Sequence, residues 1–257
     1  MKKALPGLVL GLTTISPFVV AEEDRVRYIA GVGFGVTELS FDEKLDTDPS
    51  FNMWQVFGSA LYRDLYASVS YADTISDENV SEEDETGDVS RKDFDLTLGY
   101  RISDSWTGFV GYKDGETSLD LRVRDTDVSQ DEYYREDGFF AGLTYSHPIR
   151  NAGTLSFTAA YILFDSDLKF TEGFEDDEEE EDEEDEELEF DDLEGKYSGD
   201  ATGYSIGVSW VIPVGTNFAF RAQYKLNQYD LEVKAEGKRF EPEQRLVYFD
   251  VGLVYLF

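Results

Sequence analysis

The sequence predicts an all-β fold: an antiparallel, up-and-down transmembrane β-barrel of about ten strands. Three observations lead to this prediction. Apolar and polar residues alternate with a period of two through most of the 257-residue chain, which is typical of strands with one apolar and one polar face. The connections between these segments alternate between short and long. The last segment ends on an aromatic residue, Phe257.

The first residues have the features of a secretory signal peptide. Two lysines follow the initial methionine, an apolar stretch comes next, and the small residue Ala21 precedes the acidic Glu22. The apolar stretch is too short, and too often interrupted by proline and glycine, for a membrane-spanning helix. We therefore expect residues 1–21 to be a cleaved signal peptide and residues 22–257 to form a single barrel domain.

Ten segments show the alternating pattern, and the clearest runs from Tyr204 to Ile212. The segments lie near 25–41, 51–63, 64–76, 90–102, 105–124, 133–147, 153–170, 200–213, 216–233 and 243–257. The short connections lie at 63–64, 103–104, 147–153 and 213–216, and the longer polar ones near 42–50, 77–89, 125–132, 171–199 and 234–242. An even strand number with short turns at one end and long loops at the other is the pattern of outer-membrane barrels. Eight or twelve strands remain alternatives.

One segment departs from regular alternation. In 105–124 the parity of the apolar residues changes between Tyr112 and Leu119, across Asp114 and Gly115. An Asp-Gly pair favours a two-residue hairpin turn, and a β-bulge in one long strand explains the change equally well. We expect the bulge, because an extra hairpin within the membrane would make the strand count odd.

Alternation alone does not say which face points outward, since a soluble barrel such as a lipocalin has the same period. The apolar faces carry aromatic residues near the segment ends, as expected of membrane barrels: Trp54, Tyr62, Trp106, Tyr145, Tyr204 and Trp210. The opposite face is rich in small residues, including Gly31, Gly33 and Gly35, which leave room inside a barrel. We predict that paired charges line the lumen there: Asp93, Asp95, Arg101, Arg221, Lys225 and Asp250.

The last strand places four apolar residues on one face: Val251, Leu253, Tyr255 and Phe257. With this ending, the signal peptide and the strand pattern, the chain resembles bacterial outer-membrane β-barrel proteins, such as small porin-like, OmpA-like or OmpW-like barrels. The resemblance implies that the barrel insertion machinery reads the last strand, and that the chain reaches the outer membrane through the periplasm. It also implies short periplasmic turns, long acidic extracellular loops, and outer-membrane lipid and lipopolysaccharide as surroundings.

Catalytic residues are not expected. The one histidine, His147, follows Ser146 at a predicted periplasmic turn, and neighbouring strand residues point to opposite faces, so the two would diverge. Omptin-type outer-membrane proteases resemble the chain in strand count, which implies an Asp–His pair and an Asp–Asp pair at the outer rim. The chain has no histidine there, and the same objection applies to lipid-deacylating barrel enzymes. The spacing of Gly31, Gly33 and Gly35 does not match a dinucleotide-binding motif.

Charge excludes one class of partner and marks one unusual segment. The net charge of −34 excludes nucleic-acid binding, which requires basic residues to neutralise phosphates. The chain has no cysteine, so it forms no disulfide and no cysteine-based metal site. Seventeen of the twenty residues from 175 to 194 are acidic. We expect the loop that contains them, at about 171–199, to be disordered and solvated.

Dense carboxylates also attract divalent cations. Weak, diffuse binding of Ca²⁺ or Mg²⁺ is the sharper hypothesis for this loop, without the fixed spacing of an EF-hand. The candidate ligands are Asp176, Asp177, Glu178, Asp182, Asp185, Asp191 and Asp192. No other cofactor is expected.

These features favour a non-enzymatic outer-membrane barrel that acts as a narrow passive channel or as a surface-structural protein. Eight strands enclose an interior that side chains just fill, whereas sixteen leave an aqueous channel, so ten strands predict little conductance. The alternative is a cell-surface cation-binding or interaction module that works through the polyacidic loop. An omptin-like outer-membrane enzyme is a further alternative.

Overall fold

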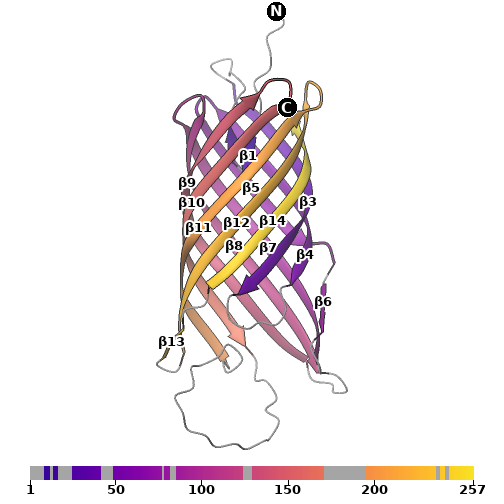
Figure 1. Ribbon diagram of the computed structural model, residues 1–257, viewed down its shortest axis with the longest axis vertical. Coiled ribbons are helices and arrows are strands. Elements are labelled where there is room, and N and C mark those ends of the chain that lie inside the picture. The colour runs from indigo at the N-terminus through magenta and orange to yellow at the C-terminus, as the bar shows by residue number, and fades with distance from the viewer. Residues whose placement is uncertain are drawn as a thin grey trace, which may run out of the picture.

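The computed structural model describes residues 9–11, 14–16, 25–41, 49–76, 78–81, 85–123, 129–170, 195–235, 238–240 and 243–257. Within these residues, ten long strands close into one antiparallel barrel (Figure 1). In chain order they are β3 (Arg27–Phe41), β4 (Ser50–Tyr62), β5 (Leu65–Thr74), β7 (Glu85–Arg101), β8 (Trp106–Val123), β9 (Ser129–Ile149), β10 (Gly153–Phe170), β11 (Gly195–Pro213), β12 (Phe218–Ala235) and β14 (Glu243–Leu256). Each strand pairs with the next in this series, and the pairing of β14 with β3 closes the cylinder.

Four short strands complete the described elements. β6 (Glu78–Ser81) pairs with β7, and β13 (Lys238–Phe240) pairs with β12. β1 (Val9–Gly11) and β2 (Thr14–Ser16) form a separate two-stranded sheet within the predicted signal peptide. The described residues include no helix long and apolar enough to cross a membrane.

The ten predicted strand segments are confirmed, but three strands begin earlier than expected. β7 begins at Glu85, β9 at Ser129 and β11 at Gly195. Residues 195–199 were predicted as part of the disordered acidic loop and are instead strand, paired with the end of β10 down to Phe170. The expected disorder of 171–194 lies outside the described residues. The predicted strands are too short because backbone hydrogen bonds between neighbouring strands continue beyond the residues that alternate between apolar and polar.

The barrel has two distinct ends. We call the end with the short connections 63–64, 102–105, 150–152 and 214–217 the turn end, and the opposite one the loop end. β3 starts and β14 finishes at the turn end, which is uppermost in Figure 1. Arg63 and Asn151 have positive φ values of 55° and 62°, as tight hairpin connections require.

The strands are staggered, which fixes the shape of the barrel. Following paired residues once round from Ile29 on β3, the path returns to β3 at Phe41, twelve residues along the strand. The path visits Ser59, Ser68, Thr97, Gly111, Phe140, Ile162, Gly203, Tyr229 and Gln244. With ordinary strand spacing and rise, this stagger corresponds to a tilt of about 40° and a backbone radius of about 10 Å. Side chains can fill an interior of that width.

The predicted bulge at Asp114 and Gly115 is wrong. Pairing of β8 with both β7 and β9 continues without interruption through these two residues. Asp114 faces outward and binds Arg135, while Gly115 lies in the interior beside Arg91. The apolar residues of β8 switch from outward to inward positions for a different reason. The outer face of the barrel is apolar toward the turn end and polar toward the loop end.

The outer face is apolar over the turn-end portion of the barrel. We call this surface the apolar belt. Its exposed members include Val32, Phe34, Val56, Val69, Leu96, Leu98, Val110, Phe139, Leu143, Phe157, Leu163, Ile206, Phe220 and Leu253. Exposed aromatic residues border it on both sides: Tyr28, Tyr62, Tyr100, Trp106 and Trp210 toward the turn end, and Phe94, Tyr204, Tyr224 and Phe249 toward the loop end.

Beyond the belt the polarity of the two faces is inverted. On β10, Leu163 is 54% exposed within the belt. Further toward the loop end, Phe164 and Leu168 are buried in the interior while Asp165 and Asp167 face outward and are exposed. The strands therefore continue past the belt into a region with an apolar interior and a polar outside, as in a water-soluble barrel.

Candidate functional site

The interior holds a cluster of eight charged residues, which we call the lumen cluster. It contains four acids and four bases, so its formal charges cancel. Its members are Asp93, Asp95, Glu136, Asp250, Arg91, Lys113, Arg221 and Lys225. They come from β7, β8, β9, β12 and β14, whose inward positions alternate with the outward positions of the apolar belt.

Arg91 is the centre of one half of the cluster. Its guanidinium is fully buried and donates to Asp93 at 2.8 and 3.1 Å and to Glu136 at 2.6 Å. It also donates to the Thr117 hydroxyl at 2.8 Å. These four hydrogen bonds, to three partners, use the planar fork of donors that arginine offers. This arrangement links β7, β8 and β9 across the interior.

Lys113 lies between two carboxylates, those of Asp93 and Asp95. Its ammonium binds Asp93 and lies 3.9 Å from Asp95 Oδ1. Ser70 donates to the other oxygen of Asp95 at 3.3 Å. Asp93 thus lies between two cations, and burial without them would be strongly unfavourable.

Arg221 occupies the opposite wall, on β12. It is fully buried, binds Asp250 and donates to Gln55 Oε1 at 2.6 Å. Its guanidinium carbon lies 4.5 Å from the centroid of the Phe57 ring. Gly33 faces this arginine, and a Cβ there would lie 3.3 Å from its Nη2 atom. The glycine therefore makes room for the guanidinium.

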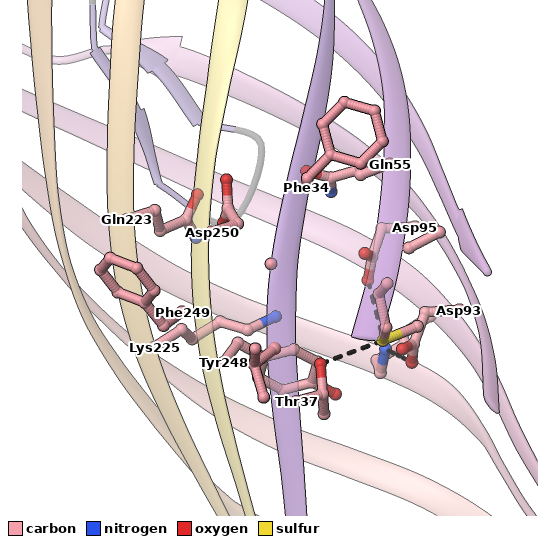
Figure 2. Close-up of a pocket in the computed structure, with 15 residues that line it drawn as sticks. Phe34, Thr37, Gln55, Asp93, Asp95, Gln223, Lys225, Tyr248, Phe249 and Asp250 are labelled. Carbon is pink, nitrogen blue, oxygen red and sulfur yellow. Dashed lines mark hydrogen bonds and ion pairs between the residues drawn. The ribbon is translucent and has the colours of Figure 1, made fainter. Parts of the chain in front are cut away.

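A small cavity lies between the two halves. Its volume is about 60 Å³, and its lining includes Asp95, Lys113, Gln223, Lys225 and Asp250. Figure 2 shows side chains from β7, β12 and β14 converging on it. The Lys225 ammonium lies 4.2 Å from the ring centroid of Tyr248, a cation–π distance. A cavity of this size holds a few water molecules.

Aromatic side chains close the interior between the cluster and the turn end. Each of four buried rings belongs to a residue directly opposite a glycine on the neighbouring strand: Phe57 and Gly31, Tyr66 and Gly99, Phe109 and Gly142, and Phe140 and Gly111. A Cβ at Gly31 would lie 2.1 Å from Phe57, and one at Gly99 would lie 2.0 Å from Tyr66. Each ring therefore packs against the backbone of its glycine, in space that a larger side chain would occupy.

A second apolar layer lies between the cluster and the loop end. It is formed by buried residues that include Phe51, Tyr134, Phe164, Tyr229, Leu231 and Leu246. Tyr134 donates its hydroxyl proton to Gln244 at 2.5 Å. The charged cluster thus lies between two apolar layers within the described interior.

Five of the six predicted lumen charges come together in this cluster, and Arg101 does not. Arg101 lies near the turn end, where it binds Asp64 at 2.5 Å. Three members of the cluster were not predicted from the sequence: Arg91, Lys113 and Glu136. Arg91 has the same parity as Asp93 and could have been found from it, whereas the predicted bulge obscured the inward position of Lys113 on β8.

Ser146 and His147 diverge as expected from neighbouring strand positions. Ser146 is buried and accepts a hydrogen bond from Ser156 at 3.0 Å, while His147 is exposed at the turn end. Among the described residues, no group of three or more histidine, cysteine or acidic side chains is arranged to hold a metal ion. The predicted cation ligands between Asp176 and Asp192 lie outside the described residues.

The C-terminal aromatic residues form an external cluster. The ring centroid of Tyr255 lies 4.8 Å from that of Phe257 and 4.9 Å from that of Phe218. The backbone amide of Phe257 donates to the carbonyl of Tyr28 at 3.0 Å, so the chain end is joined to β3. The predicted outward direction of the last apolar face is seen in the exposure of Leu253 and Phe257.

No protein-family model and no curated protein sequence matches the chain. Among solved structures, it is similar to the outer-membrane protease OmpT from Escherichia coli, with 12% identity and a TM-score of 0.55, over 94% of this chain and 100% of that chain. It is also similar to the translocator domain of the autotransporter NalP from Neisseria meningitidis, with 10% identity, a TM-score of 0.48, and coverage of 90% and 88%. The similarity to Ail from Yersinia pestis has 12% identity, a TM-score of 0.41, and coverage of 90% and 98%. The chain therefore has a closed, antiparallel, up-and-down β-barrel fold, which it shares with the OmpT structure.

Proposed function

We propose that this protein is a non-enzymatic barrel of the bacterial outer membrane that acts as a surface-structural protein and conducts solutes poorly or not at all. The observation that carries the proposal is the neutral lumen cluster, packed between two apolar layers. A path through the barrel would have to separate ion pairs that are fully desolvated, such as Arg91 with Glu136. Breaking such a pair leaves an uncompensated buried charge.

The placement in the outer membrane rests on the outer face. The apolar belt with aromatic borders is the surface expected to contact lipid, and Phe257 completes it at the chain end. Short turns face the periplasm in this proposal, and the loop end lies outside the cell. Lipid, lipopolysaccharide and the insertion machinery are the partners that this placement implies.

Planar-bilayer recordings test the closed interior. Protein extracted from the outer membrane should give no large, stable current steps, because buried ion pairs surround the cavity of about 60 Å³ in the described interior. A boiled-versus-unboiled gel shift on the same preparation serves as the control for a folded barrel. Large steps from the folded, unboiled form would contradict the proposal.

The non-enzymatic part of the proposal rests on the place of the histidine. OmpT is described as a protease, yet in the present chain the one histidine lies at the turn end, exposed and far from the loop end. An omptin-like Asp–His pair at the outer rim therefore has no histidine to use. Cleavage of peptides by the purified folded barrel, but not by its boiled form, would count against this part.

The polyacidic loop is proposed to bind cations weakly and to be dispensable for folding. Phe170 at the end of β10 pairs directly with Gly195 at the start of β11. Deleting residues 175–194 leaves four residues to connect them. A four-residue loop can join two antiparallel strands. We expect the deletion variant to keep the gel shift of a folded barrel and to bind less Ca²⁺ in calorimetry. Unchanged Ca²⁺ binding would exclude the tract as the ligand.

A further inference from the structure

A groove crosses the apolar belt near the turn end, over β4, β5, β7, β8 and β9. Its volume is about 910 Å³. We call it the turn-side groove and define it by Ala60, Tyr62, Ala67, Leu98, Gly108 and Ala141. These six residues face outward, which places the groove on the outer surface of the barrel, and its lining also includes four residues at inward positions of the same strands: Tyr66, Gly99, Phe109 and Gly142.

The shape of the groove follows from small residues that are neighbours across strands. Ala60 on β4 pairs with Ala67 on β5, so two methyl groups lie side by side and form a low row. The next row toward the turn end is tall, because Tyr62 pairs with Leu65 and Leu65 pairs with Tyr100. The alanine pair beside this taller row, together with Gly108 and Ala141, leaves a depression in the outer surface.

A second depression continues the groove toward the middle of the belt. Its volume is about 380 Å³, and it shares Leu98, Val110 and Ala141 with the turn-side groove. Tyr161 and Leu163 on β10 border it. The combined depression runs obliquely from the turn end into the centre of the belt, and its described lining is almost entirely carbon.

Positive charge lies at the mouth of the groove. Arg63 follows Tyr62, is exposed, and holds its guanidinium carbon 5.2 Å from the centroid of the Tyr62 ring. Arg25, also exposed, is next to Val26, which lines the groove. Two cations at this border stand out in a chain whose net charge is −34.

We propose that the turn-side groove binds one phospholipid molecule, with an acyl chain along the groove and the phosphate at Arg63. The inference rests on the proposed placement of the barrel in a membrane. Hydrocarbon gives no hydrophobic drive for one apolar surface to prefer another, so selection comes from van der Waals fit and from polar contacts. The groove offers the fit, and an arginine offers charge-assisted hydrogen bonds to a phosphate.

The elongated shape and the charged mouth favour a lipid over a second copy of the chain. An acyl chain is long and thin and can enter the low row between bulky side chains. A second barrel would present ridges of its own, and its turn end would bring the same arginines against these ones. Like charges at close range oppose that pairing.

Lipid binding to the protein purified from outer membranes in mild detergent tests the proposal. The probe is dipalmitoyl phosphatidylglycerol, added to the delipidated folded barrel and followed by native mass spectrometry. The Ala67→Phe variant fills the floor of the groove, and Ala222→Phe makes the same change at an outward-facing alanine of β12 away from it. We expect binding to be lost in Ala67→Phe and retained in Ala222→Phe.

The head-group contact is tested separately by Arg63→Gln. Loss of a charge-assisted hydrogen bond should weaken binding about tenfold or more. Equal lipid binding by the wild-type protein, Ala67→Phe and Arg63→Gln would overturn the proposal. A wild-type dimer that the Ala67→Phe substitution dissociates would also overturn it, because a second copy of the chain would then occupy the groove. The gel shift and membrane fractionation of the same wild-type sample report on the barrel placement itself, so failure of that placement is distinguishable from failure of lipid binding.

Discussion

Replacing Arg91 by leucine is expected to lower the free energy of unfolding of the barrel by about 3–5 kcal/mol, the usual cost of removing one partner from a buried ion pair. The guanidinium is fully buried and binds both Asp93 and Glu136. Without it, Glu136 is left in the interior with no cation at hydrogen-bond distance among the described residues. Asp93 keeps Lys113, so the loss falls mainly on Glu136.

Urea unfolding of the detergent-solubilised barrel, followed by the gel shift, measures this effect. Arg135→Leu is the matched control, because Arg135 binds Asp114 at 2.9 Å on the outer face, where both side chains are partly exposed. An exposed pair contributes only ~0–1 kcal/mol. If the two variants lose similar stability, the interior pair is not desolvated in the way its burial indicates.

A double variant separates the missing contact from the stranded charge. Arg91→Leu combined with Glu136→Leu removes both partners, and such apolar replacements are often neutral or stabilising. We expect the double variant to be more stable than Arg91→Leu alone. A double variant that is less stable than either single variant would mean that the lost packing, rather than the uncompensated carboxylate, dominates.

Gly99→Val is expected to destabilise the barrel by about 1–3 kcal/mol, the typical cost of overpacking a filled interior. A Cβ at Gly99 would lie 2.0 to 2.6 Å from three atoms of the Tyr66 ring and hydroxyl. Tyr66 is 3% exposed and packs within the aromatic layer, so a valine side chain at position 99 would force the ring out of its packed position. Denaturant unfolding measures the change.

A double-mutant cycle with Tyr66→Ala identifies the cause. Gly99→Val should cost less in the Tyr66→Ala background, because the ring that the valine meets is absent. Gly58→Val is the control, since a Cβ at Gly58 would meet only the Ile29 carbonyl oxygen at 3.8 Å. An equal cost of Gly99→Val in both backgrounds would refute contact with the Tyr66 ring as the reason.

The ten strands could be predicted because each of them has its own local alternation of apolar and polar residues. In segments such as 204–212, side chains two apart share one environment, and that periodicity is local. Extensions such as 195–199 were missed because β11 continues there with polar residues on the outside. Hydrogen bonds to β10, rather than hydrophobicity, define the strand at that level.

The site was predicted less completely because it depends on depth along the barrel. Parity placed Arg101 on the same face as Asp93, but at about 3.3 Å per residue the two lie about 26 Å apart along β7. Arg101 consequently reaches the turn end, whereas Asp93 joins the lumen cluster. The pairing of Arg91 with Glu136 joins β7 to β9 and depends on a stagger that no single segment encodes.

The balance of four acids and four bases in the lumen cluster has an electrical consequence. A voltage across a membrane acts on a charged group in proportion to its charge, at about 2.3 kcal/mol per elementary charge for each 100 mV. A rigid set of groups whose charges sum to zero experiences no net pull along the barrel axis. If the lumen cluster moved along the barrel axis as one body, it would therefore carry no net charge across the membrane, and a voltage would give no drive for that movement.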